Sequence, residues 1–150
     1  SLEVTSSHGI HLRCDALASQ VDLASYALMF LPGGMPGTLN LGASALVTDE
    51  VRRRSAAGQP LAAICAAPSI LAEHGALQAR HATANPGFMD AIAAGGALMS
   101  EAAVVRDANL ITSRGMGTAT ELGFEIIRLL LGDDAEQVVA RVKQGIVYQR

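Results

Sequence analysis

The stretch with the clearest chemical potential is an apolar run that ends at a cysteine, PLAAICAAP at residues 60–68. This pattern predicts a buried strand that turns sharply into a helix at Cys65. Pro68 suits the first turn of a helix, where a backbone N–H group has no partner to lose. A helix N-terminus favours negative charge, so a thiolate at this turn is stabilised. Small neighbours leave room for a substrate, and the stretch is typical of a nucleophile elbow with cysteine in place of serine.

Two further loops of small residues could form a site together with this cysteine, at 32–37 and at 113–118. In a parallel sheet, the loops that follow the strands converge at the carboxyl ends, where ligands bind. The N–H groups of Gly33, Gly34 and Ala66 could then face an oxyanion. A phosphate cradle is the competing interpretation of the glycines, but no Gly-Lys-Ser/Thr sequence follows them. The cysteine itself could also be an inert core residue among alanines.

Composition and charge exclude several classes of function. The length predicts a single domain over residues 1–150, and 50% hydrophobic residues can form a sizeable core. The net charge is −3 and 3% of residues are aromatic, so we expect no nucleic-acid partner. The uncharged stretch 24–48 contains Pro-Gly breaks, so we expect no membrane span. Two cysteines do not make a disulfide framework, which predicts a reducing, cytoplasmic location.

Two other clusters have a structural interpretation. His8, His11 and Cys14 are spaced three apart, but the segment 4–13 is predicted to be extended, and residues three apart in a strand point to opposite faces. We therefore expect no metal site. The three arginines at 52–54 are predicted to form the solvent-exposed face of a helix.

Apolar runs alternate with segments of helical pattern along the chain, which predicts a parallel sheet covered on both faces. Strands are expected at 26–31, 61–64, 81–84, 104–105 and 110–112. Helices are expected at 49–57, 69–74, 88–94, 119–131 and 133–143. Thr118 and Glu121 have the spacing of a capping box at the start of the fourth helix, and Gly132 is expected to end it.

Three motifs, in this order, carry a resemblance to a known family: LPGG at 31–34, AAICAAP at 62–68 and TSRGMGT at 112–118. Together they resemble the ThiJ/PfpI superfamily, in the branch of the parkinsonism-associated deglycase and the bacterial glyoxalase III enzymes. The similarity extends from about Val4 to Tyr148. It implies an α/β, flavodoxin-like three-layer sandwich with a mostly parallel sheet, usually as a homodimer.

The resemblance also implies a chemistry. The elbow cysteine, here Cys65, forms a hemithioacetal with small dicarbonyls such as methylglyoxal, and the product is lactate. Removal of early glycation adducts is attributed to the same cysteine, and no metal or organic cofactor is involved. We expect Arg114 to lie near the site or at a dimer contact.

The chain departs from the family pattern in two places. Family members begin with a strand-helix-strand unit, about 30 residues or more, which carries an acid–base glutamate. We expect this domain to be N-terminally incomplete, because no glutamate of residues 1–150 stands in that motif. At Asn85, some relatives have a histidine or tyrosine before the proline. Asparagine can donate a hydrogen bond to a substrate oxygen, but it cannot titrate.

These features leave three hypotheses. The first is a cysteine-dependent glyoxalase or deglycase, which a methylglyoxal assay would detect. The second is a redox-sensing or chaperone-like dimer in which peroxide oxidises Cys65, and the third is a catalytically silent fragment. Class I amidotransferases have a related elbow with glycines two positions to either side of the cysteine, where this chain has Ala63 and Ala67.

Overall fold

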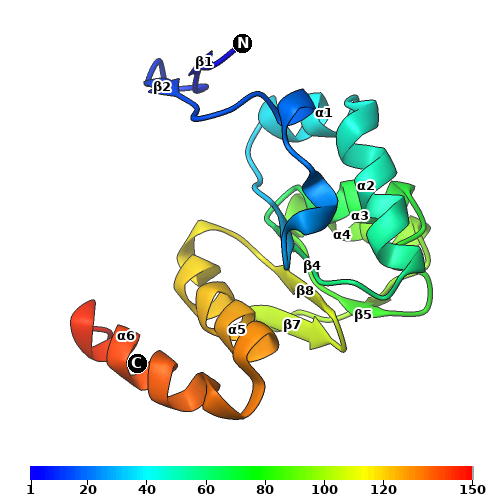
Figure 1. The fold of residues 1–150 in the computed structure, drawn as a ribbon. Coiled ribbons are helices and arrows are strands. Elements are labelled where there is room, and N and C mark those ends of the chain that lie inside the picture. The colour runs from blue at the N-terminus through cyan, green and yellow to red at the C-terminus, as the bar shows by residue number, and fades with distance from the viewer. Residues whose placement is uncertain (150) are drawn as a thin grey trace.

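The computed structural model describes residues 1–149, in which strands and helices alternate (Figure 1). The strands are β1 (Glu3–Thr5), β2 (His11–Arg13), β3 (Met29–Leu31), β4 (Leu61–Ile64), β5 (His81–Ala82), β6 (Leu98–Met99), β7 (Val104–Asp107) and β8 (Leu110–Ser113). The α-helices are α1 (Gly37–Gly42), α2 (Ala45–Ala56), α3 (Pro68–Glu73), α4 (Met89–Ala94), α5 (Ala119–Leu131) and α6 (Ala135–Gly145). Short 3₁₀ turns are η1 (Ala18–Gln20), η2 (Leu23–Ser25), η3 (Pro86–Phe88), η4 (Met116–Thr118) and η5 (Gly132–Asp134).

The central sheet has four strands in the order β3-β4-β8-β7. The first three strands are parallel, and β7 pairs antiparallel with β8 through the turn at 108–109. In this register Leu31 lies beside Ala63, and Ile64 lies beside Ser113. The loops that follow β3, β4 and β8 therefore leave the sheet at one edge, as the sequence predicts.

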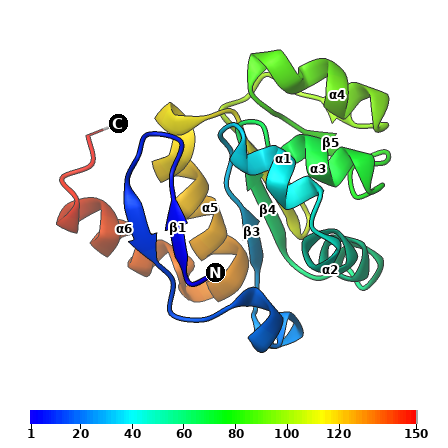
Figure 2. The same ribbon diagram turned by 90° about the horizontal axis from the view of Figure 1, so that it is seen from above.

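Helices cover both faces of the sheet, which makes a flavodoxin-like, three-layer α/β fold (Figure 2). Side chains alternate along β4, so its four buried residues belong to two separate cores. Leu61 and Ala63 pack with residues of α2, α3 and α4 on one face. Ala62 and Ile64 pack with Leu122 of α5 on the other. Both faces of β4 are buried, which explains its continuous apolar sequence.

The segment expected to be one extended stretch, 4–13, is instead a hairpin of β1 and β2. Its turn contains Gly9 at φ 77°, a conformation that glycine adopts without steric cost. The side chain of His11 makes a hydrogen bond with the Thr5 hydroxyl, 3.0 Å away. Within residues 1–149 no three His, Cys, Asp or Glu side chains are grouped to hold a metal ion.

The arginine cluster corrects the sequence-based interpretation of helix α2. This helix begins at Ala45, four residues earlier than expected, and Arg54 is 1% exposed instead of facing solvent. The Arg54 guanidinium donates to Glu50 at 2.6 Å and to the carbonyl oxygens of Leu23 and Tyr26 at 2.8 and 2.6 Å. Arg54 therefore ties the segment before β3 to α2.

Helix α5 begins and ends where the sequence predicts, but the expected capping box is not formed. Thr118 makes no side-chain cap, and its hydroxyl instead accepts a hydrogen bond from the Gly115 N–H. Glu121 accepts a hydrogen bond from the Tyr148 hydroxyl at 2.8 Å. Gly132 ends the helix at φ 56°, as expected. No helix among residues 1–149 combines the length and apolar character needed to cross a membrane.

Candidate active site

The strand-to-helix turn at the cysteine has the predicted geometry. β4 ends at Ile64, Cys65 has φ 64°, and Pro68 begins α3. A positive φ is uncommon for a residue with a Cβ, and such conformations persist only where neighbouring contacts hold them. Two hydrogen bonds do so here: the Cys65 N–H donates to the Ser113 carbonyl at 2.9 Å, and the Asn85 N–H donates to the Cys65 carbonyl at 2.9 Å.

Cys65 lies on the wall of a cavity of about 670 Å³ at the carboxyl edge of the sheet. The residues predicted from sequence that line it are Gly33, Gly34, Cys65 and Asn85. The remaining lining residues are Phe30, Ile64, Met116, Ala119, Leu122, Gly123 and Ile126. The cavity thus lies between the carboxyl ends of β3 and β4 and one face of α5.

The two glycines after β3 meet the elbow in different ways. A Cβ on Gly33 would lie 2.6 Å from the Cys65 Cβ and 2.6 Å from the Ile64 carbonyl oxygen, so only glycine fits there. Gly34 has open space around it but adopts φ 91°. Within residues 1–149, the N–H groups of Gly33, Gly34 and Ala66 make no hydrogen bond. Three backbone N–H groups in or near the turn that carries the thiol therefore have no partner among the described residues.

Ala66 does not line the cavity directly. It is 1% exposed, and its nitrogen would lie 3.2 Å from a Cβ on Gly33. The structure therefore brings the Ala66 nitrogen close to Gly33, while the Ala66 methyl group stays buried.

Asn85 connects the elbow to the loop before α4. Its backbone N–H holds the Cys65 carbonyl, and its side-chain oxygen accepts a hydrogen bond from the Gly87 N–H at 3.2 Å. With Oδ1 engaged in this way, the amide Nδ2 is the group that can donate to a guest. A Cβ on Gly115 would lie 3.9 Å from this nitrogen, so Asn85 also adjoins the loop after β8.

Arg114 does not line the cavity, although its loop does. Its guanidinium donates to the Glu101 carbonyl at 2.8 Å, and its N–H donates to the Ala103 carbonyl at 3.1 Å. The same loop is braced by the Ser113 and Thr118 hydroxyls, 2.6 Å apart. The sequence did not predict this hydroxyl pair, because Thr118 was assigned to a helix cap.

The rest of the lining is apolar, and it too was missed in the sequence. Leu122 and Ile126, one turn apart on α5, have the spacing of an apolar helix face, and helical spacing alone does not distinguish a core from a cavity wall. Met116 also lines the cavity and is 93% exposed. Among residues 1–149, no carboxylate, histidine, lysine or arginine lines the cavity. The cavity therefore offers a thiol, backbone donors and one amide in apolar surroundings.

The fold and the site together define a class: α/β proteins with a cysteine at a nucleophile elbow on the carboxyl edge of a mostly parallel sheet. The sequence profile of the DJ-1/PfpI family matches residues 1–129, and this chain belongs to that family.

Similar proteins come from distant organisms. Protein dj-1beta of Drosophila melanogaster is 36% identical over 138 residues, which are 92% of this chain and 74% of the fly protein. A protein named deglycase from Pyrococcus abyssi is 30% identical over 128 residues, 85% of this chain and 76% of the archaeal protein. Protein DJ-1 homolog A of Arabidopsis thaliana is 34% identical over 140 residues, 93% of this chain but 36% of the plant protein.

The fold comparison agrees with the sequence comparison. The crystal structure of Drosophila melanogaster DJ-1beta matches with a TM-score of 0.88 and 34% identity. The match covers 99% of this chain and 78% of the fly chain. The predicted ThiJ/PfpI resemblance is confirmed.

Proposed function

We propose that this chain is a cofactor-independent, cysteine-dependent enzyme of the glyoxalase III or deglycase type, acting on methylglyoxal or on early glycation adducts. The observation that carries the proposal is the position of Cys65, held at φ 64° on the cavity wall beside the unsatisfied amides of Gly33 and Gly34. The archaeal relative that is named a deglycase supports a reaction of this kind.

In the proposed first step, the Cys65 sulfur adds to the aldehyde carbon of methylglyoxal. A C–S bond forms, the C=O π bond breaks, and its electron pair moves to oxygen. The proton of the Cys65 thiol passes through water to that oxygen, which gives the hemithioacetal. The amides of Gly33, Gly34 and Ala66 would stabilise that oxyanion, and one such donor typically changes kcat by about 10²- to 10³-fold. The Asn85 amide would donate to the neighbouring ketone oxygen.

Lactate formation then needs a proton to leave the former aldehyde carbon, which carries the sulfur, and another proton to reach the former ketone carbon. This gives a thioester, which water hydrolyses to release the acid and the thiol. The described cavity wall contains no carboxylate or histidine for these transfers. In our proposal, therefore, a water molecule or a buffer ion carries the protons.

The central test is turnover of methylglyoxal to lactate, followed by NMR, with a glycated peptide as the second substrate. We expect turnover by the chain and none above background for Cys65→Ser. Cys14→Ser is the matched control, because Cys14 is exposed beyond β2 and should leave the rate unchanged. If the chain turns over neither methylglyoxal nor the glycated peptide, and peroxide oxidises Cys65, the proposal is overturned. That result would favour the redox-sensor hypothesis.

We also propose that the chain forms a homodimer and needs no metal or organic cofactor. Light scattering should then give twice the chain mass of 15.5 kDa, and dialysis against a chelator should leave turnover unchanged. A monomer mass at all concentrations, or loss of turnover on chelation, would contradict these two points separately.

A further inference from the structure

The cavity beside Cys65 is larger than methylglyoxal needs. Its volume of about 670 Å³ lies within the range of about 300–1,000 Å³ that is typical of pockets for drug-sized ligands. Methylglyoxal is a three-carbon molecule, and only its aldehyde carbon has to reach the sulfur. The rest of the cavity and the residues that line it therefore determine which substituent a dicarbonyl substrate can carry.

Helix α5 forms one long wall of this cavity. Four of its residues line the cavity, at the spacing of a single stripe along a helix: Ala119, Leu122, Gly123 and Ile126. A helix rises about 1.5 Å per residue, so this stripe is about 10 Å long. Because α5 follows β8 through a short loop and packs back against the sheet, the stripe leads away from the carboxyl edge where Cys65 lies.

The sheet forms the facing wall of the cavity. Phe30 on β3 lines it and is 44% exposed. Ile64, at the end of β4, lines it as well and belongs with Leu122 to one apolar cluster. Cys65 and Ile126 both pack against this cluster. The residue that carries the thiol and the stripe on α5 therefore converge on the same apolar surface.

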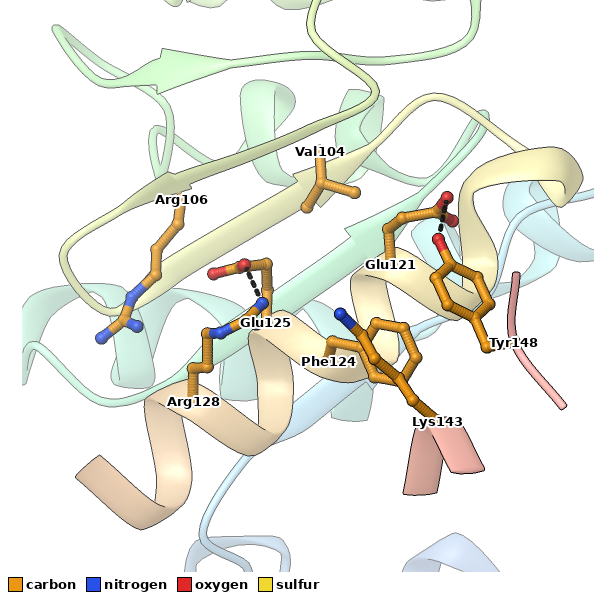
Figure 3. Close-up of a pocket in the computed structure, with 8 residues that line it drawn as sticks. All are labelled: Val104, Arg106, Glu121, Phe124, Glu125, Arg128, Lys143 and Tyr148. Atoms are coloured by element: carbon orange, nitrogen blue, oxygen red, sulfur yellow. Dashed lines mark hydrogen bonds and ion pairs between the residues drawn. The ribbon is translucent and has the colours of Figure 1, made fainter. Parts of the chain in front are cut away.

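The two sides of α5 differ in charge. On the side away from Cys65, Glu125 and Arg128 form an ion pair at 2.7 Å and line a separate cleft with other charged residues (Figure 3). Among the described residues, no charged side chain lines the Cys65 cavity. A charged or strongly hydrated substituent would lose water there without gaining a charged partner, and such a transfer is costly. The cavity therefore favours an apolar substituent.

We propose that the site prefers α-oxoaldehydes whose ketone carries an apolar chain longer than methyl, and that Phe30 and Ile126 determine this preference. The inference rests on the proposed function. The sulfur of Cys65 adds to the aldehyde carbon with the bond changes given above, while the chain lies along the α5 stripe. The product is the 2-hydroxy acid of the same length. Each methylene that leaves water should favour binding by about fourfold.

Steady-state kinetics with methylglyoxal and with 2-oxooctanal, which has five more methylenes, test the proposal. Each value of kcat/KM is divided by the rate constant of the same aldehyde with free N-acetylcysteine, which corrects for intrinsic reactivity. We expect the corrected value to be about tenfold or more higher for 2-oxooctanal, even where only part of its chain is buried. Equal corrected values would contradict the preference.

A second measurement needs no turnover. Methyl and hexyl methanethiosulfonate each transfer an alkylthio group to a thiolate, which forms a mixed disulfide and releases methanesulfinate. In Cys14→Ser, where Cys65 is the single thiol, the hexyl reagent should react about tenfold or more faster after the same correction. If methylglyoxal is turned over and neither measurement shows a preference, the inference is overturned and the proposed function stands. If neither aldehyde is turned over but the hexyl preference is present, the proposed function fails and the apolar recognition stands.

Ile126→Thr and Phe30→Ala change the two walls separately. Each should lower the hexyl-to-methyl ratio about fivefold, because each removes apolar contacts with the chain. The matched control is Ile127→Thr, the same replacement at the next position of α5, which does not line the cavity and should keep the wild-type ratio. Far-UV circular dichroism identifies the folded variants, and the partly exposed Phe30 keeps the test available if Ile126→Thr does not fold. An unchanged ratio in the folded wall variants, or an equal decrease in Ile127→Thr, would overturn the assignment of these walls.

Discussion

At the scale of single residues, the adjacent Gly33 and Gly34 are required for different reasons. Replacing Gly33 with alanine places a Cβ 2.6 Å from both the Cys65 Cβ and the Ile64 carbonyl, so the elbow itself must shift. Replacing Gly34 meets no atom but forces a side chain into φ 91°, a strain of about 1–2 kcal/mol.

We therefore expect Gly33→Ala to lose most methylglyoxal turnover, whereas Gly34→Ala should chiefly lower the melting temperature. Gly37→Ala is the control, because its Cβ has open space and its φ is not positive. Steady-state kinetics and thermal unfolding on all three variants separate the two effects. Full activity in Gly33→Ala would contradict the tight packing at the elbow.

The acid–base step gives a second prediction at this scale. A positioned acid or base typically contributes about 10²- to 10⁴-fold to a rate, and the described cavity wall has none. Small carboxylates such as formate and acetate should therefore enter the cavity and raise lactate formation in proportion to their concentration. The assay holds pH and ionic strength constant and uses chloride as the inert comparison. If the rate of lactate formation does not change with the concentration of added carboxylate, the acid–base group must lie outside this cavity wall.

At the scale of elements, Arg54 determines how α2 is attached to the rest of the fold. Removing one member of a buried ion pair typically costs about 3–5 kcal/mol, because the partner charge stays buried. In Arg54→Leu the carbonyls of Leu23 and Tyr26 lose their donor as well, so we expect a loss of unfolding free energy near 3 kcal/mol or more.

The control for this prediction is Arg52→Leu, two residues earlier on the same helix. Arg52 is about half exposed, pairs with the exposed Asp49 and makes a hydrogen bond with His74 Nδ1 at 3.1 Å, so its loss should cost about 1 kcal/mol or less. Urea unfolding measures both changes. Similar free energies for the two variants would show that the Arg54 contacts add little to stability.

The same helix shows what the sequence could and could not predict. Periodicity and glycine placement predicted most of the helices and strands, and β4, the Cys65 turn and the Gly132 helix end are where they were predicted. Helix α1 and strand β6 were not predicted, and β3 begins at Met29, three residues later than expected. A charge on one side of a helix carries no information about the partner, so the burial of Arg54 by a carboxylate and two distant carbonyls was not predictable. Likewise the Thr118 hydroxyl could serve a helix cap or a loop, and tertiary contacts selected the loop.

For the candidate site, the three motifs predicted which residues come together, but they did not predict what each of these residues contacts. Gly33, Gly34, Cys65 and Asn85 converge on one cavity because parallel strands end at one edge. The apolar wall from α5 and the brace between Asn85 and Cys65 depend on how loops pack across the sheet, which no local pattern encodes.

At the scale of the whole molecule, the carboxylates paired in the fold determine its stability in acid. Hydrogen bonds from Arg53, opposed in part by burial and assisted by Arg54, lower the pKa of Glu50 from 4.5 to about 2. The His81 N–H, together with Arg80, lowers the pKa of Asp107. Groups whose pKa is lowered by folding stabilise the fold fully above their unfolded pKa, and this contribution is lost as protons bind at lower pH.

We therefore expect the unfolding free energy to fall as the pH decreases from about 4.5 toward 2, with Glu50 responsible for part of the slope. Glu50→Gln should be less stable at pH 7 but should lose less stability over that interval, so its curve approaches the wild-type curve in acid. Glu3→Gln, on the exposed β1, is the control and should run parallel to the wild type. Urea unfolding at a series of pH values measures the three curves. A Glu50→Gln curve that stays parallel to the wild type down to pH 2 would show that the Glu50 carboxylate does not couple folding to protons, and that the Arg53 and Arg54 contacts act through packing alone.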